Sequence, residues 1–214
     1  MFADRREAGR RLAALVAPLA GERPTVLALP RGGVPIGFEV ALALQAPLDV
    51  LVVRKLGVPH RRELAMGAIG EDGGIVSDPQ IMRQCAVTTS EFDDVVERER
   101  QTVDDQVRRY RGERTSAPIS DRTAIIVDDG LATGATARTA CQIARSRAPR
   151  RVVLAVPVAP AETVQALRDV ADEVICAETP SGFYAVGQWY RDFSQVPDDE
   201  VARLLDDAAS LRSE

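Results

Sequence analysis

The stretch A-I-I-V-D-D-G-L-A-T-G-A-T, residues 124–136, carries most of the information about the fold. Apolar residues of a buried strand lead directly into two adjacent acids, Asp128 and Asp129, and a loop of small and hydroxyl residues follows. The residues after this loop have the pattern of a helix. In open α/β sheets, ligands bind beyond the carboxyl ends of the strands, which is the position of this loop. The stretch therefore predicts a strand, a ligand-binding loop and a helix, in that order.

The loop has the features of a phosphate-binding turn. Free backbone N–H groups and the dipole at a helix N-terminus attract an anion. Thr133 and Thr136 can add hydroxyl donors, and Gly134 permits close approach of the backbone. No Gly-Lys-Ser/Thr follows, as a Walker A loop requires, and the chain has no G-x-G-x-x-G dinucleotide fingerprint. The sequence therefore predicts a phosphate site that is neither of these two kinds.

The two acids need a separate explanation, because carboxylates repel phosphate. They could hold Mg²⁺, which takes carboxylate and phosphate oxygens together. They could instead accept hydrogen bonds from a vicinal diol, such as the 2′ and 3′ hydroxyls of ribose. A sugar that carries a phosphate satisfies both halves of the stretch, with the acids at its hydroxyls and the loop at its phosphate. The alternative to a sugar-phosphate site is two solvated acids beside an ordinary tight turn. The complete loop sequence argues against this alternative.

The composition limits the class of protein. The chain has 214 residues, 45% of them hydrophobic, which is enough for one full core with or without a small appendage. A net charge of -5 argues against nucleic-acid binding through a basic surface. No apolar run approaches the roughly 20 residues of a membrane span, and the N-terminus has no secretory segment, so we expect a cytoplasmic protein without a membrane partner. Three widely spaced cysteines indicate free thiols in a reducing compartment: Cys85, Cys141 and Cys176.

The hydrophobic pattern alternates between strands and helices, which predicts an α/β fold with a parallel twisted sheet flanked by helices. A charged, irregular stretch is expected at 54–64, before two short strands at 65–70 and 74–76. Ser90 and Asp93 form the expected capping pair of a long helix. The remaining strands are expected at 25–29, 48–53, 123–127, 151–156 and 173–177, and the remaining helices at 5–20, 34–44, 135–147, 160–170 and 198–211.

The segment V-D-D-G-L-A-T-G-A-T, 127–136, resembles the phosphoribosyl-pyrophosphate (PRPP) signature of type I phosphoribosyltransferases. In that family two acids hold the ribose hydroxyls and the loop backbone holds the 5′-phosphate. The resemblance implies that Asp128 and Asp129 are catalytic ribose ligands and also lie at a Mg²⁺ site. It implies a 5′-phosphate site made of Ala132, Thr133, Gly134, Ala135 and Thr136.

Two further segments resemble the pyrophosphate-binding parts of the family. P-R-G-G, 30–33, follows the first core strand, where the family has a short loop that grips pyrophosphate and can carry a strained peptide bond. The resemblance gives this role to Arg31 and Gly32. It also gives pyrophosphate contacts to Arg54 and Lys55, at the end of the second strand. Of these residues, Arg31 and Lys55 are expected to be catalytic, and residues 56–73 are expected to form a mobile lid.

The segment F-Y-A-V-G-Q-W-Y-R-D-F, 183–193, resembles the base-binding region of purine phosphoribosyltransferases. The resemblance implies a base site made of Tyr184, Val186 and Trp189, although a core or dimer contact explains Trp189 equally well. Arg191 would contact pyrophosphate and Asp192 would lie near Mg²⁺, but the Arg-Asp pair follows at a shorter spacing than in the family. Hypoxanthine-guanine enzymes have an acid where this chain has Ala132, so the base is left open.

The resemblance covers residues 5–205 and implies a single, Rossmann-like type I phosphoribosyltransferase domain over 1–214. Its core would span about 22–178, and the chain ends, about 1–20 and 179–214, would form a small hood. The implied activity is Mg²⁺-dependent transfer of the phosphoribosyl group from PRPP to a nitrogenous base, with a purine favoured and pyrophosphate released. The implied assembly is a homodimer without nucleic acid.

Two other interpretations of the same residues are open. A PRPP or nucleotide sensor would keep the binding site and lose the transfer reaction. A receiver-like domain with an aspartate phosphoacceptor would also have acids at a strand end, but such domains lack the T-G-A-T loop. Arg31, Lys55 and an intact lid segment favour the transferase.

Overall fold

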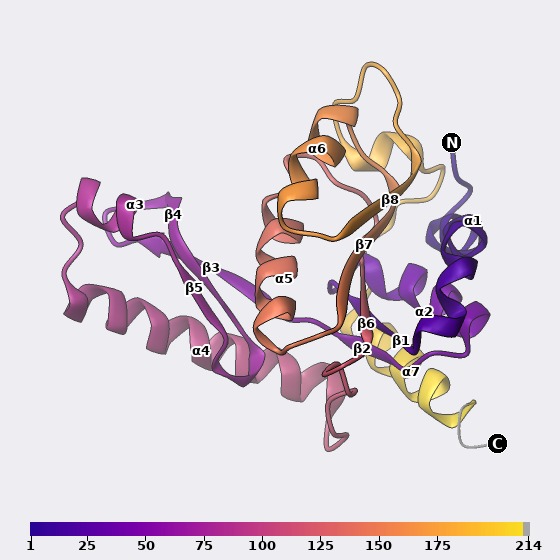
Figure 1. Ribbon diagram of the computed structural model, residues 1–214, viewed down its shortest axis with the longest axis horizontal. Coiled ribbons are helices and arrows are strands. Elements are labelled where there is room, and N and C mark those ends of the chain that lie inside the picture. Colours follow the sequence, from indigo (N-terminus) through magenta and orange to yellow (C-terminus); the bar gives the residue numbers. More distant parts are fainter. Residues whose placement is uncertain (212–214) are drawn as a thin grey trace.

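Two sheets build the protein, as Figure 1 shows for the computed structural model, which describes residues 1–211. The larger sheet is parallel, with the strand order β2-β1-β6-β7-β8. The smaller sheet is antiparallel, with the order β3-β4-β5. The strands are β1 Pro24–Ala28, β2 Leu48–Val50, β3 Val53–Val58, β4 Arg61–Gly70, β5 Ile75–Ser77, β6 Thr123–Val127, β7 Arg151–Val158 and β8 Glu173–Glu178.

Helices cover both faces of the larger sheet. The α-helices are α1 Arg5–Val16, α2 Gly33–Leu44, α3 Pro79–Gln84, α4 Thr89–Arg111, α5 Ala135–Ser146, α6 Ala161–Ala166 and α7 Asp198–Ser210. Short 3-10 turns occupy Ala17–Glu22, Glu71–Gly73, Leu167–Asp169 and Val186–Trp189. The strands alternate along the chain with α2, α5 and α6, as the sequence predicted.

The core strands are apolar on both sides, because each side meets a helix layer. Val26, Ile125 and Val153 face one cluster together with residues of α1 and α2. The neighbouring positions on the same strands, Leu27 and Ile126 among them, face the other cluster together with residues of α5. This two-sided burial confirms the α/β fold class with a parallel sheet flanked by helices.

The order of the strands creates a place for a ligand. From β1 the chain crosses to β2 on one side, and from β6 it crosses to β7 on the other side. Since β1 and β6 are neighbours and run parallel, the loops that follow them emerge side by side at one edge of the sheet. This is the topological switch point at which open α/β sheets bind ligands.

The predicted strand over 48–53 is wrong, because the chain changes sheets within it. The strand β2 ends at Val50, and Val53 already begins β3 of the smaller sheet. The irregular stretch expected after it is wrong too, since β3 and β4 pair as a long antiparallel hairpin. Leu56, Val58 and Met66 of this hairpin are buried among apolar residues that include those of α4. Consecutive charged residues, Arg54-Lys55 and Arg61-Arg62-Glu63, interrupt the apolar alternation and hid the strand pattern from the sequence analysis.

The expected start of the long helix is also wrong by two residues. Thr88, not Ser90, caps α4, and its side chain accepts a hydrogen bond from the N–H of Glu91. Glu91 in turn accepts from the N–H of Thr88 at 2.9 Å, which completes a capping box. A threonine with glutamate three residues later satisfies two free donors at once, whereas the Ser90 and Asp93 pair would satisfy neither of these. The short helix α3 had no counterpart in the prediction.

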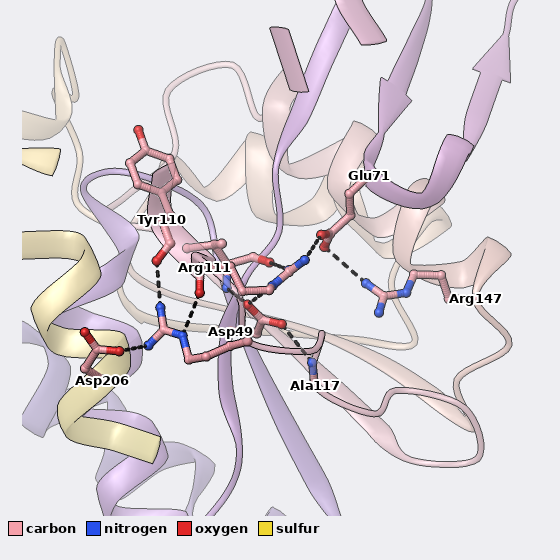
Figure 2. Close-up of polar contacts among 9 residues, drawn as sticks. Asp49, Glu71, Tyr110, Arg111, Ala117, Arg147 and Asp206 are labelled. Carbon is pink, nitrogen blue, oxygen red and sulfur yellow. Dashed lines mark hydrogen bonds and ion pairs between the residues drawn. The ribbon is translucent and has the colours of Figure 1, made fainter. Parts of the chain in front are cut away.

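The smaller sheet and α4 form an arm that projects from the core, on the left of Figure 1. A buried ionic network joins this arm to the core (Figure 2). Arg111, the last residue of α4, donates through Nε to Asp49 of β2 at 3.0 Å. Its Nη1 lies 2.6 Å from Glu71, which sits in the turn between β4 and β5. Arg147, just after α5, reaches Glu71 from the other side at 3.3 Å.

Within residues 1–211, no helix combines the length and the apolar character that a membrane crossing needs. The three cysteines are free thiols, as predicted. Burial raises the pKa of Cys141 to about 12 and that of Cys176 to about 11, so both thiols stay protonated at neutral pH.

Candidate functional site

Two loops that the sequence singled out meet at the switch point. The P-R-G-G loop follows β1, and the acidic pair follows β6. The N–H of Leu29 donates to the carbonyl of Val127 at 2.8 Å, which ties the end of β1 to the end of β6. A Cβ on Gly32 would lie 2.0 Å from Oδ2 of Asp129, so only glycine allows the loop to approach the acid this closely. The peptide bond between Pro30 and Arg31 is cis, in the loop for which the resemblance implied an unusual bond.

The two acids are held in different ways. Oδ1 of Asp128 accepts the backbone N–H of Asp129 at 2.8 Å. Oδ2 of Asp129 accepts from Nε of Arg5 at 2.9 Å and lies at the same distance from Nη2. The hydroxyl of Tyr190 donates to the backbone carbonyl of Asp129 at 2.5 Å. The acidic pair is therefore fixed by residues from both ends of the chain.

The environment favours the neutral form of both carboxyls. Burial raises the pKa of Asp128 well above its usual value, and the charge of Asp129 adds to the rise. Burial also raises the pKa of Asp129, although the guanidinium of Arg5 opposes this rise. Groups with such shifts in a ligand-binding position are candidates for functional residues. A cation or a set of hydroxyl donors would stabilise the ionised pair.

Hydrogen bonds to neighbouring elements anchor the loop from Gly130 to Thr136, while several of its residues are exposed to solvent. The N–H of Leu131 donates to the carbonyl of Val158 at 3.0 Å, and the hydroxyl of Thr163 donates to the carbonyl of Ala132 at 2.8 Å. Gly134 begins α5 with a φ of 73°, and a Cβ there would lie 2.9 Å from the side chain of Leu167. Four residues of the loop are exposed: Ala132, Thr133, Ala135 and Thr136.

This geometry suits an anion. The first N–H groups of α5 have no intrahelical acceptor. The N–H of Ala135 donates weakly to the hydroxyl of Thr133 at 3.4 Å. The helix dipole adds positive potential there. The loop therefore has the geometry of an anion-binding site beside the two acids, as the sequence predicted. Its role as the 5′-phosphate site stays a prediction.

Three of the predicted pyrophosphate contacts, Arg31, Arg54 and Lys55, each have a carboxylate partner. Nη1 of Arg31 lies 3.6 Å from Asp198 at the start of α7. Arg54 pairs with a glutamate of α4 at 3.2 Å, and Lys55 pairs across the hairpin with Glu63 at 3.2 Å. A cleft of about 130 Å³ is lined by residues of three predicted segments and of α4, among them Pro30, Arg54, Tyr110 and Thr136. One cleft is thus shared by the P-R-G-G loop, Arg54 and the loop from Gly130 to Thr136, the phosphate loop.

The residues predicted to bind the base lie in the segment that leads from β8 to α7. Tyr184 is 90% exposed and free to contact a ligand. Val186 lies against the loop at Gly130, where a Cβ would come within 2.6 Å of it. Trp189 stacks on Phe183 with ring centroids 6.4 Å apart, and its buried indole N–H has no hydrogen-bond partner within residues 1–211. Trp189 thus packs, partly buried, against the core cluster that contains Phe2 and Tyr190, and its base-binding role stays a prediction.

The two remaining candidates lie at the chain ends. The backbone N–H of Arg191 donates to the carbonyl of Phe2 at 2.9 Å, and its side chain is exposed. Asp192 accepts hydrogen bonds from the N–H and the hydroxyl of Ser194. The backbone N–H of Asp192 donates to the carbonyl of Ala3 at 2.9 Å, so backbone contacts hold the segment against the N-terminus. The ligand roles of both residues stay predictions.

The donor set fits Mg²⁺ only as a metal shared with a substrate. Among residues 1–211, no group of three or more His, Cys, Asp or Glu could hold a metal ion, and so Asp192 does not complete a site with the acidic pair. Asp128 and Asp129 supply hard carboxylate oxygens. Mg²⁺ commonly takes one or two protein carboxylates and completes its shell with waters and substrate phosphates.

The close approach at Gly32 gives a direct test of this geometry. We expect Gly32→Ala to lower the affinity for PRPP about tenfold or more, because the new Cβ would displace the carboxylate of Asp129. The backbone of Gly32 has ordinary helical angles, so alanine adds no backbone strain there. Calorimetric titration with PRPP measures the effect. Gly21→Ala is the control, because a Cβ there meets nothing within 4 Å; equal affinities of the two variants would contradict the predicted clash.

Comparison with known proteins agrees with this geometry. Residues 5–193 match the family model described as "Phosphoribosyl transferase domain". Two proteins from Mycobacterium tuberculosis strains, each named "Putative phosphoribosyl transferase", are 51% identical over 208 residues. These 208 residues are 97% of this chain but 47% of each relative, so the chain spans about half the length of the curated relatives it matches.

A solved structure resembles nearly the whole chain. The crystal structure of TT1426 from Thermus thermophilus superposes with a TM-score of 0.87 at 43% sequence identity. The match covers 96% of this chain and 97% of that one. A match of this extent includes the arm as well as the central sheet, so both belong to the shared architecture.

Proposed function

The chain belongs to the phosphoribosyl transferase domain family, and on that premise we propose that it transfers the 5-phosphoribosyl group of PRPP to a nitrogenous base and releases pyrophosphate. One observation carries the proposal: the acidic pair, the phosphate loop and the P-R-G-G loop meet at a single edge of the sheet. A phosphorylated sugar with a diphosphate at C1′ has a complementary arrangement of groups. The same observation supports a single site rather than three separate surface features.

Each part of PRPP would meet a group of suitable chemistry. Asp128 and Asp129 would accept hydrogen bonds from the ribose hydroxyls. The backbone N–H groups between Ala132 and Thr136 would hold the 5′-phosphate, and that of Ala135 would exchange its contact with Thr133 for the ligand. Arg31, with Arg54 and Lys55 from the hairpin, would contact the pyrophosphate, and for this each would exchange its present carboxylate partner for the ligand.

The reaction would be helped mainly by electrostatics. Glycosyl transfer develops positive charge on the sugar ring, and the leaving pyrophosphate gains negative charge. The carboxylates of the acidic pair would lie near the ring, and the guanidinium of Arg31 would lie near the leaving group. Mg²⁺, when bound with the substrate, would supply further positive charge at the pyrophosphate. The hairpin of β3 and β4 would act as the lid that limits the access of water.

We propose a purine as the acceptor. The segment 183–193 has the order of residues on which the resemblance to purine enzymes rests, and Tyr184 presents an exposed ring for stacking on a base. We also propose that the whole of 1–214 forms one such domain, with the chain ends as its hood, and that it acts as a cytoplasmic homodimer.

The test is pyrophosphate release from PRPP and Mg²⁺, across adenine, guanine, hypoxanthine, xanthine, uracil, orotate and simple amines. Release with one purine establishes both the transferase and its substrate. Release with another acceptor alone overturns the purine assignment and keeps the transferase. No release with any acceptor, together with tight PRPP binding by calorimetry, would instead identify a PRPP sensor.

The role of Arg31 makes a separate prediction. We expect Arg31→Ala to weaken pyrophosphate binding about tenfold or more, because a charge-assisted contact to the diphosphate is lost. Binding of a nucleoside monophosphate should change much less, since that ligand has no group at the Arg31 position. Competition titrations with both ligands measure the two losses. Equal losses would count against a pyrophosphate role for the P-R-G-G loop.

A further inference from the structure

We propose that Arg5 is a positioning residue of the sugar site, which fixes the carboxylate of Asp129 so that one defined oxygen faces the ribose. This inference deepens the proposed function and rests on it. No sequence motif assigns Arg5 a role, and it lies 124 positions from the acid that it contacts. Arg5 would not touch the substrate; it would act through Asp129.

Three residues contact the guanidinium of Arg5: Asp129, Phe193 and Ser194. Nε and Nη2 both lie 2.9 Å from Oδ2 of Asp129. Nη1 donates to the backbone carbonyl of Ser194 at 2.7 Å. The ring of Phe193 lies against it, with 3.9 Å between Cζ and the ring centroid. The side chain is only 11% exposed, so removing it from this position would break several contacts at once.

This anchoring distinguishes Arg5 from a removable counter-ion. The side chains of Arg54 and Lys55 are themselves 44% and 54% exposed, whereas Arg5 is 11% exposed, so a ligand can reach and replace the ion pairs of the first two. Arg5 instead is enclosed by the hood segment and by the P-R-G-G loop, since a Cβ on Gly32 would lie 3.3 Å from its Nε. A guanidinium with fixed planar geometry suits a structural contact of this kind.

The Arg5 contact determines which carboxylate oxygens can still accept hydrogen bonds from a ligand. Oδ2 of Asp129 accepts a hydrogen bond from Arg5, and Oδ1 of Asp128 accepts one from the N–H of Asp129. One oxygen of each acid, Oδ1 of Asp129 and Oδ2 of Asp128, accepts no hydrogen bond from another residue in the described part of the chain. Two acceptors on adjacent residues match the two hydroxyls of a vicinal diol. Without Arg5 the Asp129 carboxylate could rotate, and this match would be lost.

The test compares PRPP with two ligands that each contain one part of it, ribose 5-phosphate and pyrophosphate. We expect Arg5→Gln to lower the affinities for PRPP and for ribose 5-phosphate together, by about tenfold or more. Pyrophosphate affinity should stay within about twofold, because the polar contacts of Arg5 go to Asp129 and Ser194 and to none of the charged residues assigned to pyrophosphate. Arg5→Lys should recover part of the loss, since one ammonium keeps the charge but cannot make the same set of contacts.

Arg6→Gln is the matched control. Arg6 lies next to Arg5 on α1, pairs with Glu39 at 2.9 Å and stacks on Phe38, and it touches no residue of the site. It should leave all three affinities unchanged. If Arg5→Gln weakens pyrophosphate as much as the sugar ligands, the positioning role is overturned in favour of a general structural one. Unchanged or tighter PRPP binding also overturns it, and tighter binding would mean that Arg5 competes with the substrate.

Two further measurements separate this inference from the proposed function. Wild-type protein that binds neither PRPP nor ribose 5-phosphate would overturn both. Wild-type binding with an unaffected Arg5→Gln variant would overturn the Arg5 role alone. In an Asp129→Asn background, Arg5→Gln should cost little further PRPP affinity, because the carboxylate it positions is already gone. Fully additive losses would contradict an action through Asp129.

Discussion

Replacing both acids, Asp128→Asn with Asp129→Asn, is expected to lower the affinity for PRPP about 100-fold or more. Each carboxylate would lose a charge-assisted hydrogen bond to a ribose hydroxyl, and two such losses multiply. The fold should be kept, because both side chains have nearly the same shape as before, an asparagine oxygen can still accept a hydrogen bond from Arg5, and a buried like-charge contact disappears. Calorimetry with PRPP measures the affinity, and thermal unfolding measures the stability.

An adjacent acid pair on α4 provides the control. Asp93→Asn with Asp94→Asn makes the same chemical change on two exposed residues away from the site, so PRPP binding should be unaffected. Pyrophosphate binding should survive in the Asp128 and Asp129 variant, since its contacts lie on the other loop. An unchanged titration heat with PRPP would remove the basis for the ribose assignment.

The largest effect on stability is expected from Arg111→Met, which should lower the free energy of unfolding by about 3–5 kcal/mol. Arg111 lies between Asp49 and Glu71 (Figure 2), whose side chains are 7% and 3% exposed. Removing the arginine leaves two buried carboxylates without their main cation. Burial already raises the pKa of Glu71, and the bond from Arg111 opposes that rise. Denaturant unfolding measures the loss.

Two comparisons separate this effect from the general loss of an arginine. Arg108→Met removes an exposed ion pair with Asp105 on the same helix and should cost less than about 1 kcal/mol. Neutralising the network as a whole, with Asp49→Asn, Glu71→Gln and Arg111→Met together, should recover part of the loss, because no unpaired charge remains. A single variant as stable as the wild type would show that the network does not anchor the arm to the core.

Much of the fold could be predicted from the sequence, because its signals are local. Buried strands such as 123–127 are continuous apolar runs, and helices such as α5 show their period within a few turns. The acidic pair and the phosphate loop are contiguous, so their relation to each other needed no tertiary information. The family resemblance rested on the same contiguous stretch, and the comparisons confirm it.

The wrong predictions share a different physical origin. The stretch 48–53 reads as one apolar strand, and only packing determines that the chain leaves one sheet after Val50 and enters another at Val53. In the hairpin of β3 and β4, consecutive charged residues such as Arg61, Arg62 and Glu63 interrupt the apolar alternation of a strand, so its pattern becomes clear only where α4 packs on its apolar residues. Burial on one side of an element is a property of its neighbours rather than of its own residues.

The sequence by itself determined which groups lie at the switch point: two acids, a glycine- and threonine-containing loop and an arginine between proline and glycine. Only the tertiary structure decided how these groups are held, with Arg5 on one acid, the hydroxyl of Tyr190 on its backbone and the P-R-G-G loop against its carboxylate. Such contacts join residues that are far apart along the chain. No local pattern encodes them, because they depend on how both chain ends pack beside the parallel sheet.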